Sequence, residues 1–317
     1  MSFIVEGKSC FFILMAITLL ASSSVLALGI GIEPGANLVT VRQLGKPIET
    51  DPLRVINVNP KPQIYTIDIV IEDPLKGYTK LPDSSWIYPE KDSFRLEAYD
   101  TLELPIFCNI PDDEGYYNRA FRAEINVTQH TPHDEAARSR GFTEFLLAAR
   151  SIWFFETPSK SNLPKAIDGD PISIAPTLYI IEYDTTWKDK TLEATVPVTI
   201  RNDDTITHQY FLETFVPDYG EFYEDFTLDI LPFGEGNWIP DLGWLQPKKK
   251  GFLFIKWTPK PKLAPGESKT IDFKIELPQA TELGDLLYDA VVMVKPEEQK
   301  KDSRFIRFVF IPRLKYE

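Results

Sequence analysis

Hydrophobic and polar residues alternate along many short stretches of this chain, and that two-residue period is typical of β-strands. In the stretch 64–71, for example, Tyr65, Ile67 and Ile69 share one parity, and polar side chains occupy part of the other. The stretch 121–127 alternates in the same way. Such stretches present one face to a core and the other to solvent, as strands of antiparallel sheets do. The pattern therefore predicts an all-β chain.

Two stretches, 52–65 and 197–210, carry the same landmarks in the same order. Both begin with Pro, place Asn five residues later and end with Tyr eight residues after that, in the sequences PLRVINVNPKPQIY and PVTIRNDDTITHQY. Each predicts a strand, a turn and a second strand. Further along, Pro111 and Pro278 are each followed by an aromatic residue ten positions later. Landmarks that recur in order predict an internal duplication.

The duplication also predicts that Trp257 is the counterpart of Trp86. Because 21 residues separate Tyr65 from Trp86 and 47 separate Tyr210 from Trp257, the second copy is expected to carry 26 extra residues. Turn signals between short strands, with no long helical period, favour immunoglobulin-like β-sandwiches. The segment from 156 to 170 is polar and contains prolines, which is typical of a linker between domains.

The predicted fold is therefore all-β, with two tandem immunoglobulin-like β-sandwich domains after an N-terminal signal peptide. The expected boundaries are a signal peptide at 1–27, a first domain at 28–160, a linker at 161–170, and a second domain at 171–317 that contains an aromatic-rich insertion at about 217–254.

The N-terminal residues predict export. Lys8 precedes an apolar run at 10–20, and small residues follow as far as Ala27, which suits cleavage after Ala27 by a signal peptidase. The stretch 9–32 contains no charged residue and is long enough to span a bilayer, so a retained membrane anchor is the alternative. Both interpretations place the rest of the chain outside the cytoplasm, in the periplasm, on the cell surface or in the medium.

The net charge of −13 argues against nucleic acid or an anionic lipid surface as a partner, since both bind basic surfaces. A membrane is a partner only if the N-terminal segment is retained as an anchor. The chain has three histidines and shows no Ser-His-Asp, paired-Cys or phosphate-binding glycine pattern at a usable spacing. We therefore predict no enzyme activity, no cofactor and no metal site. Carboxylates at 112–114 and 168–170 leave calcium binding open.

Cys108 is expected to be a small buried hydrophobic residue and not a nucleophile. In the stretch 102–110 it shares its parity with Leu104 and Ile106, which are apolar. The other cysteine, Cys10, lies in the predicted signal peptide, so the exported chain cannot form an internal disulfide.

The predicted insertion is rich in aromatic residues mixed with Gly, Pro and acidic residues. Aromatic side chains supply large contact areas on partner surfaces and sugar platforms. They can equally form a small core that closes the insertion over the second domain. For the first interpretation we expect Trp238 or Trp244 to be exposed, and the candidate partner-binding residues are Tyr219, Tyr223, Trp238 and Trp244.

One segment supports a family resemblance. Residues 141–158 read GFTEFLLAARSIWFFETP, and they follow a Phe-Arg-Leu segment at 94–96 and a Tyr-rich strand at 117–127. The first half thus resembles the first domain of periplasmic pilus-assembly chaperones, whose last strand donates apolar side chains to a subunit. The resemblance implies five strand-donation candidates, namely Phe142, Phe145, Leu147, Trp153 and Phe155. Both halves also resemble extracytoplasmic immunoglobulin-like repeats, with a Pro-Gly-Glu turn at 265–267.

Taken together, these patterns predict an exported, non-enzymatic structural or protein-binding component of the cell surface or envelope, with other envelope or surface proteins as its partners. One alternative is a periplasmic pilus-assembly chaperone that acts by strand donation, a form of β-augmentation. A second alternative is a carbohydrate-binding module that uses Trp238 and Trp244.

Overall fold

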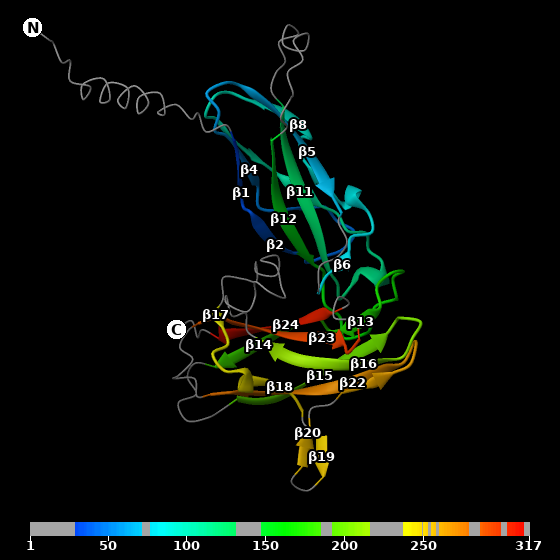
Figure 1. Ribbon diagram of the computed structural model, residues 1–317. Coiled ribbons are helices and arrows are strands. Elements are labelled where there is room, and N and C mark those ends of the chain that lie inside the picture. The colour runs from blue at the N-terminus through cyan, green and yellow to red at the C-terminus, as the bar shows by residue number, and fades with distance from the viewer. Residues whose placement is uncertain are drawn as a thin grey trace, which may run out of the picture.

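The computed structural model describes residues 29–71, 77–130, 147–184, 192–215, 237–248, 250–252, 255–257, 260–278, 286–298 and 303–313. The predicted signal peptide lies outside these residues. In the described residues the regular structure consists of β-strands and short 3-10 helices, which confirms the all-β prediction. Figure 1 shows two sandwiches, the first above the second. No helix in this described part is long and apolar enough to cross a membrane.

The first sandwich is built from residues up to the end of β12. One layer contains β1 (Ile30–Glu33), β4 (Leu53–Asn57) and β9 (Thr101–Leu104), continued by β3 (Ile48–Glu49), β10 (Ile106–Cys108) and β7 (Ile87–Pro89). The other layer has the order β2 (Ala36–Thr40), β12 (Leu147–Glu156), β11 (Ala120–His130), β5 (Gln63–Val70) and β8 (Ser93–Leu96), with β6 (Thr79–Lys80) beside β11. Two 3-10 helices, η2 (Ser84–Trp86) and η3 (Glu114–Tyr116), lie in the connections.

The second sandwich repeats this arrangement. One layer has the order β13 (Ile172–Ala175), β15 (Leu192–Asn202), β22 (Ser268–Leu277) and β18 (Leu245–Pro247). The other has β14 (Leu178–Asp184), β24 (Arg304–Arg313), β23 (Tyr288–Pro296), β16 (His208–Phe215) and β21 (Lys262–Leu263), with β17 (Asn237–Trp238) beside β23. The 3-10 helix η5 (Leu242–Trp244) precedes β18, and β19 (Lys250–Phe252) and β20 (Ile255–Trp257) form a separate hairpin.

Each sandwich has its own apolar core, and the alternation along the strands explains why. In β11, Phe121, Ala123 and Ile125 point into the first core, where they meet Trp153. The second core is centred on side chains such as Phe273 and Phe308. Since each core is filled by its own strands, the prediction of two tandem sandwiches is confirmed at the level of the fold.

The burial predicted for Cys108 is confirmed. Its side chain is 1% exposed in the first core. Burial raises the pKa of Cys108 to about 12, because the charged thiolate is poorly solvated there. The parity that predicted burial in the stretch 102–110 is therefore the parity that the strand adopts.

The predicted counterpart of Trp86 is wrong. Trp86 ends η2, whereas Trp257 lies in the hairpin strand β20. The residue at the equivalent place is Trp244, at the end of η5. Asp83 and Asp241 cap the two 3-10 helices in the same way, by accepting hydrogen bonds of 2.8 and 2.7 Å from backbone N–H groups two residues later.

The reason for the error is that tryptophan followed by a nearby proline occurs three times in the second copy, at 238–240, 244–247 and 257–259. The sequence at 244–247, WLQP, matches WIYP at 86–89, and the competing match was WTP at 257–259. Tyr210 to Trp244 is 34 residues, against 21 from Tyr65 to Trp86. The extra residues of the second copy are therefore divided between two places, one before and one after Trp244.

Candidate functional site at the domain junction

The two sandwiches meet in an apolar cluster to which both contribute. Tyr78 and Phe154 come from the first sandwich, and Val291, Met293 and Phe305 come from β23 and β24 of the second. The ring of Tyr78 lies 4.6 Å from that of Phe154 and 6.0 Å from that of Phe305, measured between centroids. All five side chains are buried. The junction is therefore packed like a core and is not a hinge between separate bodies.

Asp170, at the end of the predicted linker, is the centre of a buried ion-pair network. Its carboxylate accepts hydrogen bonds from Arg119 Nη1 at 2.7 Å, from Arg304 Nη2 at 2.5 Å and from Thr79 Oγ1 at 2.8 Å. The side chain of Asp170 is 2% exposed. Arg119 and Thr79 belong to the first sandwich and Arg304 begins β24, so one carboxylate ties the two sandwiches together.

The guanidinium of Arg119 has further partners in the first sandwich, in the segment between the sandwiches and in β13. It donates to the carbonyl oxygens of Gly115 at 3.1 Å, Lys165 at 3.1 Å and Ile172 at 3.2 Å. It also donates to Ser173 Oγ at 3.2 Å. Burial lowers the pKa of Arg119, and the neighbouring Asp170 opposes that shift. A buried guanidinium is stable only with such a full set of acceptors.

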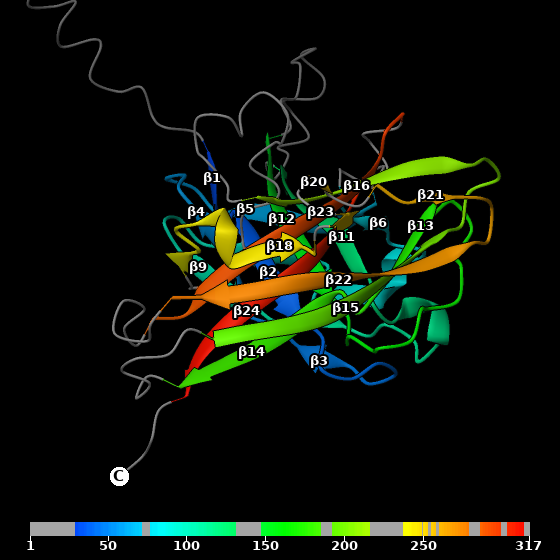
Figure 2. The ribbon, with the colours of Figure 1, turned by 90° about the horizontal axis from the view of Figure 1, so that it is seen from below.

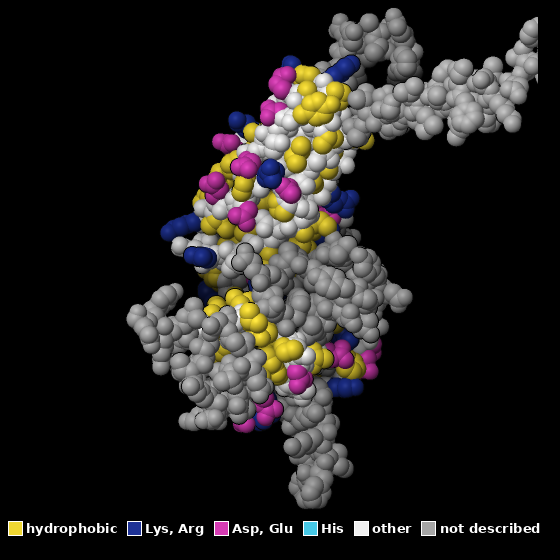
Figure 3. Space-filling view, turned by 90° about the vertical axis from the view of Figure 1, so that its left-hand side faces the viewer, with side chains coloured by type: hydrophobic (Ala, Val, Ile, Leu, Met, Phe, Trp, Pro, Cys, Tyr) yellow, Lys and Arg dark blue, Asp and Glu magenta, His cyan; other side chains and the backbone are white. Residues whose placement is uncertain are grey.

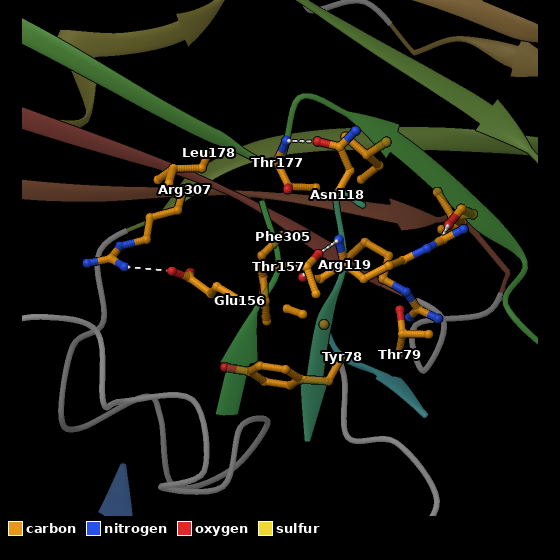
Figure 4. A pocket seen from close by; sticks show the side chains of 15 residues that line it. Tyr78, Thr79, Asn118, Arg119, Glu156, Thr157, Thr177, Leu178, Phe305 and Arg307 are labelled. Atoms are coloured by element: carbon orange, nitrogen blue, oxygen red, sulfur yellow. Dashed lines mark hydrogen bonds and ion pairs between the residues drawn. The ribbon is translucent and has the colours of Figure 1, made fainter. Parts of the chain in front are cut away.

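A second ion-pair network closes the other side of the junction. Arg307 in β24 donates to Glu156, the last residue of β12, at 2.9 Å and to Asp289 in β23 at 2.9 Å. These three side chains are 14% exposed or less. Burial raises the pKa of the Glu156 carboxyl, although Arg307 lowers it in part. Figure 4 shows the pair between Arg307 and Glu156 across the two sandwiches.

The cavity between these networks is small, at about 30 Å³. That volume has room for a water molecule, whereas pockets for small molecules measure about 300 Å³ or more. In its polar wall, Asn118 Oδ1 accepts the N–H of Lys160 at 2.9 Å and Asn118 Nδ2 donates to the Lys160 carbonyl at 2.9 Å. Figure 4 shows Asn118 turned toward the backbone of Thr177. The geometry suits holding two domains together and leaves no room for a substrate.

The junction also positions the edge strand β14. Ser159 Oγ accepts the N–H groups of Thr177 at 3.0 Å and Leu178 at 3.2 Å. The N–H of Arg307 donates to the Thr177 carbonyl at 2.8 Å. The start of β14 is thus anchored by the same residues that join the sandwiches.

The structure describes only some of the candidate residues of the insertion. Trp244 is 7% exposed and packs in the second core, with its ring 5.4 Å from that of Tyr288. Of the two tryptophans of which one was expected to be exposed, Trp244 is therefore buried, because the 3-10 helix turns its side chain inward, and the expectation now rests on Trp238. Trp238 lies in β17, which pairs with β23, and its side chain is outside the described residues. Tyr219 and Tyr223 are also outside them.

The strand-donation candidates lie in and before β12. Trp153 and Phe155 are fully buried in the core of their own sandwich, so these two side chains are not available for a partner. From Ile152 to Glu156, β12 pairs with β11 on one side and with β2 on the other. Leu147 is half-buried at the start of β12. Phe142 and Phe145 lie outside the described residues.

The polar groups considered for metals have other contacts. Asp113 caps η3 by accepting the N–H of Gly115 at 2.7 Å, and Asp112 accepts the hydroxyl of Tyr117 at 2.7 Å. Among the described residues no three His, Cys, Asp or Glu side chains gather as a metal site.

No pattern in the sequence identified the residues of the junction. Arg119, Asp170, Arg304 and Arg307 are far apart in the sequence and belong to no motif. The useful signal was weak: Arg119, Asp170 and Arg304 are charged residues that lie at or just before the start of a strand.

Comparison with known proteins places the chain by fold only. No family model matches it, and no curated protein matches it. Among solved structures it is similar to an ASH/PapD-like domain of human CEP192, at 11% identity and a TM-score of 0.33, over 50% of this chain and 96% of that one. It is also similar to a protein of unknown function from Porphyromonas gingivalis, at 12% identity and a TM-score of 0.31, over 89% and 99% of the two chains.

The E. coli chaperone DraB is similar over 89% of this chain and 98% of its own, at 11% identity and a TM-score of 0.30. The resemblance to pilus chaperones is thus a loose one of fold. What the protein does has to be inferred from its own contacts.

Proposed function

We propose that this protein is an exported, non-enzymatic component of the cell surface or envelope that binds another protein with its two sandwiches fixed at one angle. The observation that carries the proposal is the buried junction. Asp170, Glu156 and Asp289 hold three arginines there, beside an apolar cluster that both sandwiches share.

The energetics of that junction favour a rigid body. Separating the sandwiches would expose the shared apolar cluster and would leave buried charges without their partners, and breaking a buried ion pair typically costs about 3–5 kcal/mol. A rigid tandem presents one surface made by both domains, and it loses less conformational entropy on binding than two loosely linked domains do. Export rests on the N-terminal residues, and the net charge of −13 suits a solvated exported surface.

The experiment is capture of partners by the tagged full chain from envelope extracts of the source organism, compared with two variants. Asp170→Ala removes the central carboxylate, and Glu33→Gln is the control, since Glu33 forms an exposed ion pair with Arg54. Small-angle X-ray scattering on each variant reports whether the sandwiches keep their angle. We expect Asp170→Ala to broaden the distribution of interatomic distances from scattering. We also expect it not to capture the proteins that wild type and Glu33→Gln capture. Equal capture by a variant whose domains have separated would overturn the proposal.

Strand donation is a second candidate, favoured by one observation. β2 pairs with β12 only from Ile152 onward, so on that side no described strand pairs with Leu147 or Ala148. A partner strand could bind there without displacing β2. Ala148→Pro would remove the N–H of Ala148 from that edge, and loss of a captured partner from this variant alone would favour donation over the surface of the rigid tandem.

A further inference from the structure

We propose that the outer edge of β14 binds an extended, apolar and basic segment of a partner protein, which adds a strand to the second sandwich. The inference rests on the proposed function, because it names the place and the chemistry of the protein contact. The residues that carry it are Ile180 and Glu182 on the edge, with the side chains of β14 and β15 behind them.

The backbone of β14 leaves one edge without a described partner strand. β14 pairs in parallel with β24 over its whole length, from Leu178 to Asp184. No strand in the described part of the chain pairs with its other edge. The N–H of Arg307 donates to the Thr177 carbonyl. Because successive residues of a strand direct their N–H and C=O groups to opposite edges, those of Ile180 and Glu182 point away from β24.

The side chains of β14 do not protect that edge. Proteins commonly guard edge strands with lysine or proline, and β14, with the sequence LYIIEYD, contains neither. Ile180 is 60% exposed. Figure 3 shows that hydrophobic side chains reach the described surface of the second sandwich.

The duplication makes the exposure of Ile180 informative. Leu38 pairs with Phe154 in the first sandwich, and Ile180 pairs with Val309 at the equivalent place in the second. Leu38 packs against the apolar cluster of the junction, so the second sandwich covers it. In the second sandwich the corresponding apolar side chain, that of Ile180, is exposed.

In the part of the chain that the structure describes, the neighbouring layer also has an unpaired strand edge at this margin. β15 pairs with β22 from Leu192 onward, but β13 pairs with β15 only from Thr199 to Asn202. In the first sandwich β1 pairs with β4 over the equivalent residues, Arg54 to Asn57, but β4 begins at Leu53, so only β15 extends well beyond its partner strand. Figure 2 shows β14 and β15 beside each other at the margin of the second sandwich. Partly buried side chains line this margin, namely Tyr179, Ile181, Ala194 and Val196.

These contacts define the occupant. An added strand would pair its backbone with Ile180 and Glu182, and every second side chain would turn inward toward Ile181 and Val196, which favours apolar residues there. Glu182 and Glu193 are exposed near the same margin, and the chain carries a net charge of −13. Charge complementarity therefore favours lysine or arginine at the other positions of the added strand. It disfavours a second copy of this acidic chain.

The test uses a synthetic extended peptide of alternating valine and lysine as the probe, with the purified full chain. Binding is measured by fluorescence anisotropy, and hydrogen exchange locates the protected amides. We expect the peptide to protect the N–H groups of Ile180 and Glu182. A peptide with glutamate in place of lysine should bind at least tenfold more weakly, and one with N-methylated backbone nitrogens should not bind.

The main variant is Ile180→Pro, which removes an outward N–H and leaves the bonds between β14 and β24 in place. It should weaken binding at least tenfold. Should it fail to fold, Glu182→Lys places a guard charge on the same edge and should also weaken binding. Ile206→Ala is the control, since Ile206 is 46% exposed in a turn elsewhere in the second sandwich.

Protection at another strand, or equal binding by wild type and both edge variants, would overturn the edge site. Concentration-dependent dimers that Ile180→Pro abolishes would overturn the choice of occupant. The proposed function would survive either result if the edge variants still capture the envelope partner. The proposed function would fail, and the edge site would survive, if the peptide binds at β14 but no envelope protein is captured.

Discussion

Asn57 and Asn202 make the same hydrogen bonds in the two sandwiches. Asn57 Nδ2 donates to the carbonyls of Lys61 at 3.0 Å and Leu96 at 3.4 Å, and Asn57 Oδ1 accepts the N–H of Asn59 at 3.0 Å. Asn202 Nδ2 donates to the carbonyls of Ile206 at 2.7 Å and Leu263 at 3.0 Å. Asn202 Oδ1 accepts the N–H of Asp204 at 3.1 Å. Both side chains are fully buried, which confirms their predicted equivalence.

Because both amides satisfy buried backbone carbonyls, Asn57→Ala and Asn202→Ala should each destabilise the protein. Each leaves buried polar groups unpaired, which costs about 1–3 kcal/mol per group. Urea unfolding measured by tryptophan fluorescence checks this, with Thr205→Ala in an exposed turn as the control. Equal unfolding midpoints for wild type and both asparagine variants would contradict the structural role.

The Pro, Asn and Tyr spacing identified the duplication because those residues perform fixed local tasks. Asn57 organises a turn within its own neighbourhood, and Tyr65 fills the core from the next strand. The tryptophan match failed because it lay beyond segments of unequal length, where spacing no longer identifies the equivalent residue. Trp244 could have been recognised from Asp241, three residues earlier, as Asp83 precedes Trp86.

The junction was less predictable from the sequence. The sequence placed Asp170 only in a polar linker and among carboxylates that leave calcium binding open, yet its partners are Arg119, 51 residues earlier, and Arg304, 134 residues later. Pairs at such separations leave no periodic pattern. The free edge of β14 was hidden for a different reason. Ile180 alternates like any strand residue, and only the strand order shows that no described strand pairs with the outer edge of β14.

Trp244→Ala should cost about 3–5 kcal/mol, as truncations of large buried aromatic residues do. The indole packs against Tyr288 and is almost fully buried. Thermal unfolding of this variant is the measurement. Leu242→Ala is a matched control, because Leu242 lies in the same 3-10 helix and is 45% exposed. If Trp244→Ala lowers the unfolding temperature no more than Leu242→Ala does, the indole of Trp244 is exposed and not part of the core.

Cys108 should react slowly with thiol reagents in the folded protein and rapidly after unfolding. It is 1% exposed and its pKa is raised to about 12, so the thiolate that such reagents need is both scarce and inaccessible. Labelling with a maleimide, with and without denaturant, measures the ratio of the two rates. Fast labelling of the native protein would show that β10 opens readily.

Glu156→Gln should change how stability depends on pH. Burial raises the pKa of Glu156 above its ordinary value of 4.5, so the folded state binds the proton more tightly than the unfolded state. The contribution of this carboxyl to the free energy of unfolding is therefore complete below about pH 4.5. It is lost as the pH rises through the raised pKa that Glu156 has in the folded state. Relative to Glu156→Gln, the wild type should lose unfolding free energy as the pH rises above about 4.5.

Urea unfolding at a series of pH values provides that comparison. Glu213→Gln is the control, since Glu213 pairs with Lys295 on the surface with a side chain 59% exposed. The opposite slope would mean that attraction to Arg307 outweighs burial at Glu156.

Gly77→Ala should loosen the domain junction while both sandwiches stay folded. Gly77 has a φ of 95°, and its N–H donates to the Ser303 carbonyl at 3.0 Å. A Cβ at this position would lie 1.6 Å from Cε2 of Phe305, whose ring is held in the shared apolar cluster. The ring must move to admit it, and the cluster separates as a result.

Gly169→Ala is the matched control for that change. Gly169 has a φ of 82°, so an alanine there carries a similar backbone cost of about 1–2 kcal/mol. Nothing lies within 4 Å of its added Cβ. The distribution of interatomic distances from small-angle X-ray scattering should broaden for Gly77→Ala alone. Limited proteolysis should cut this variant faster between the sandwiches. The two cores do not include Gly77, so the far-ultraviolet circular dichroism of both variants should match the wild type. Identical scattering from the two variants would show that the contact between Gly77 and Phe305 does not hold the domains together.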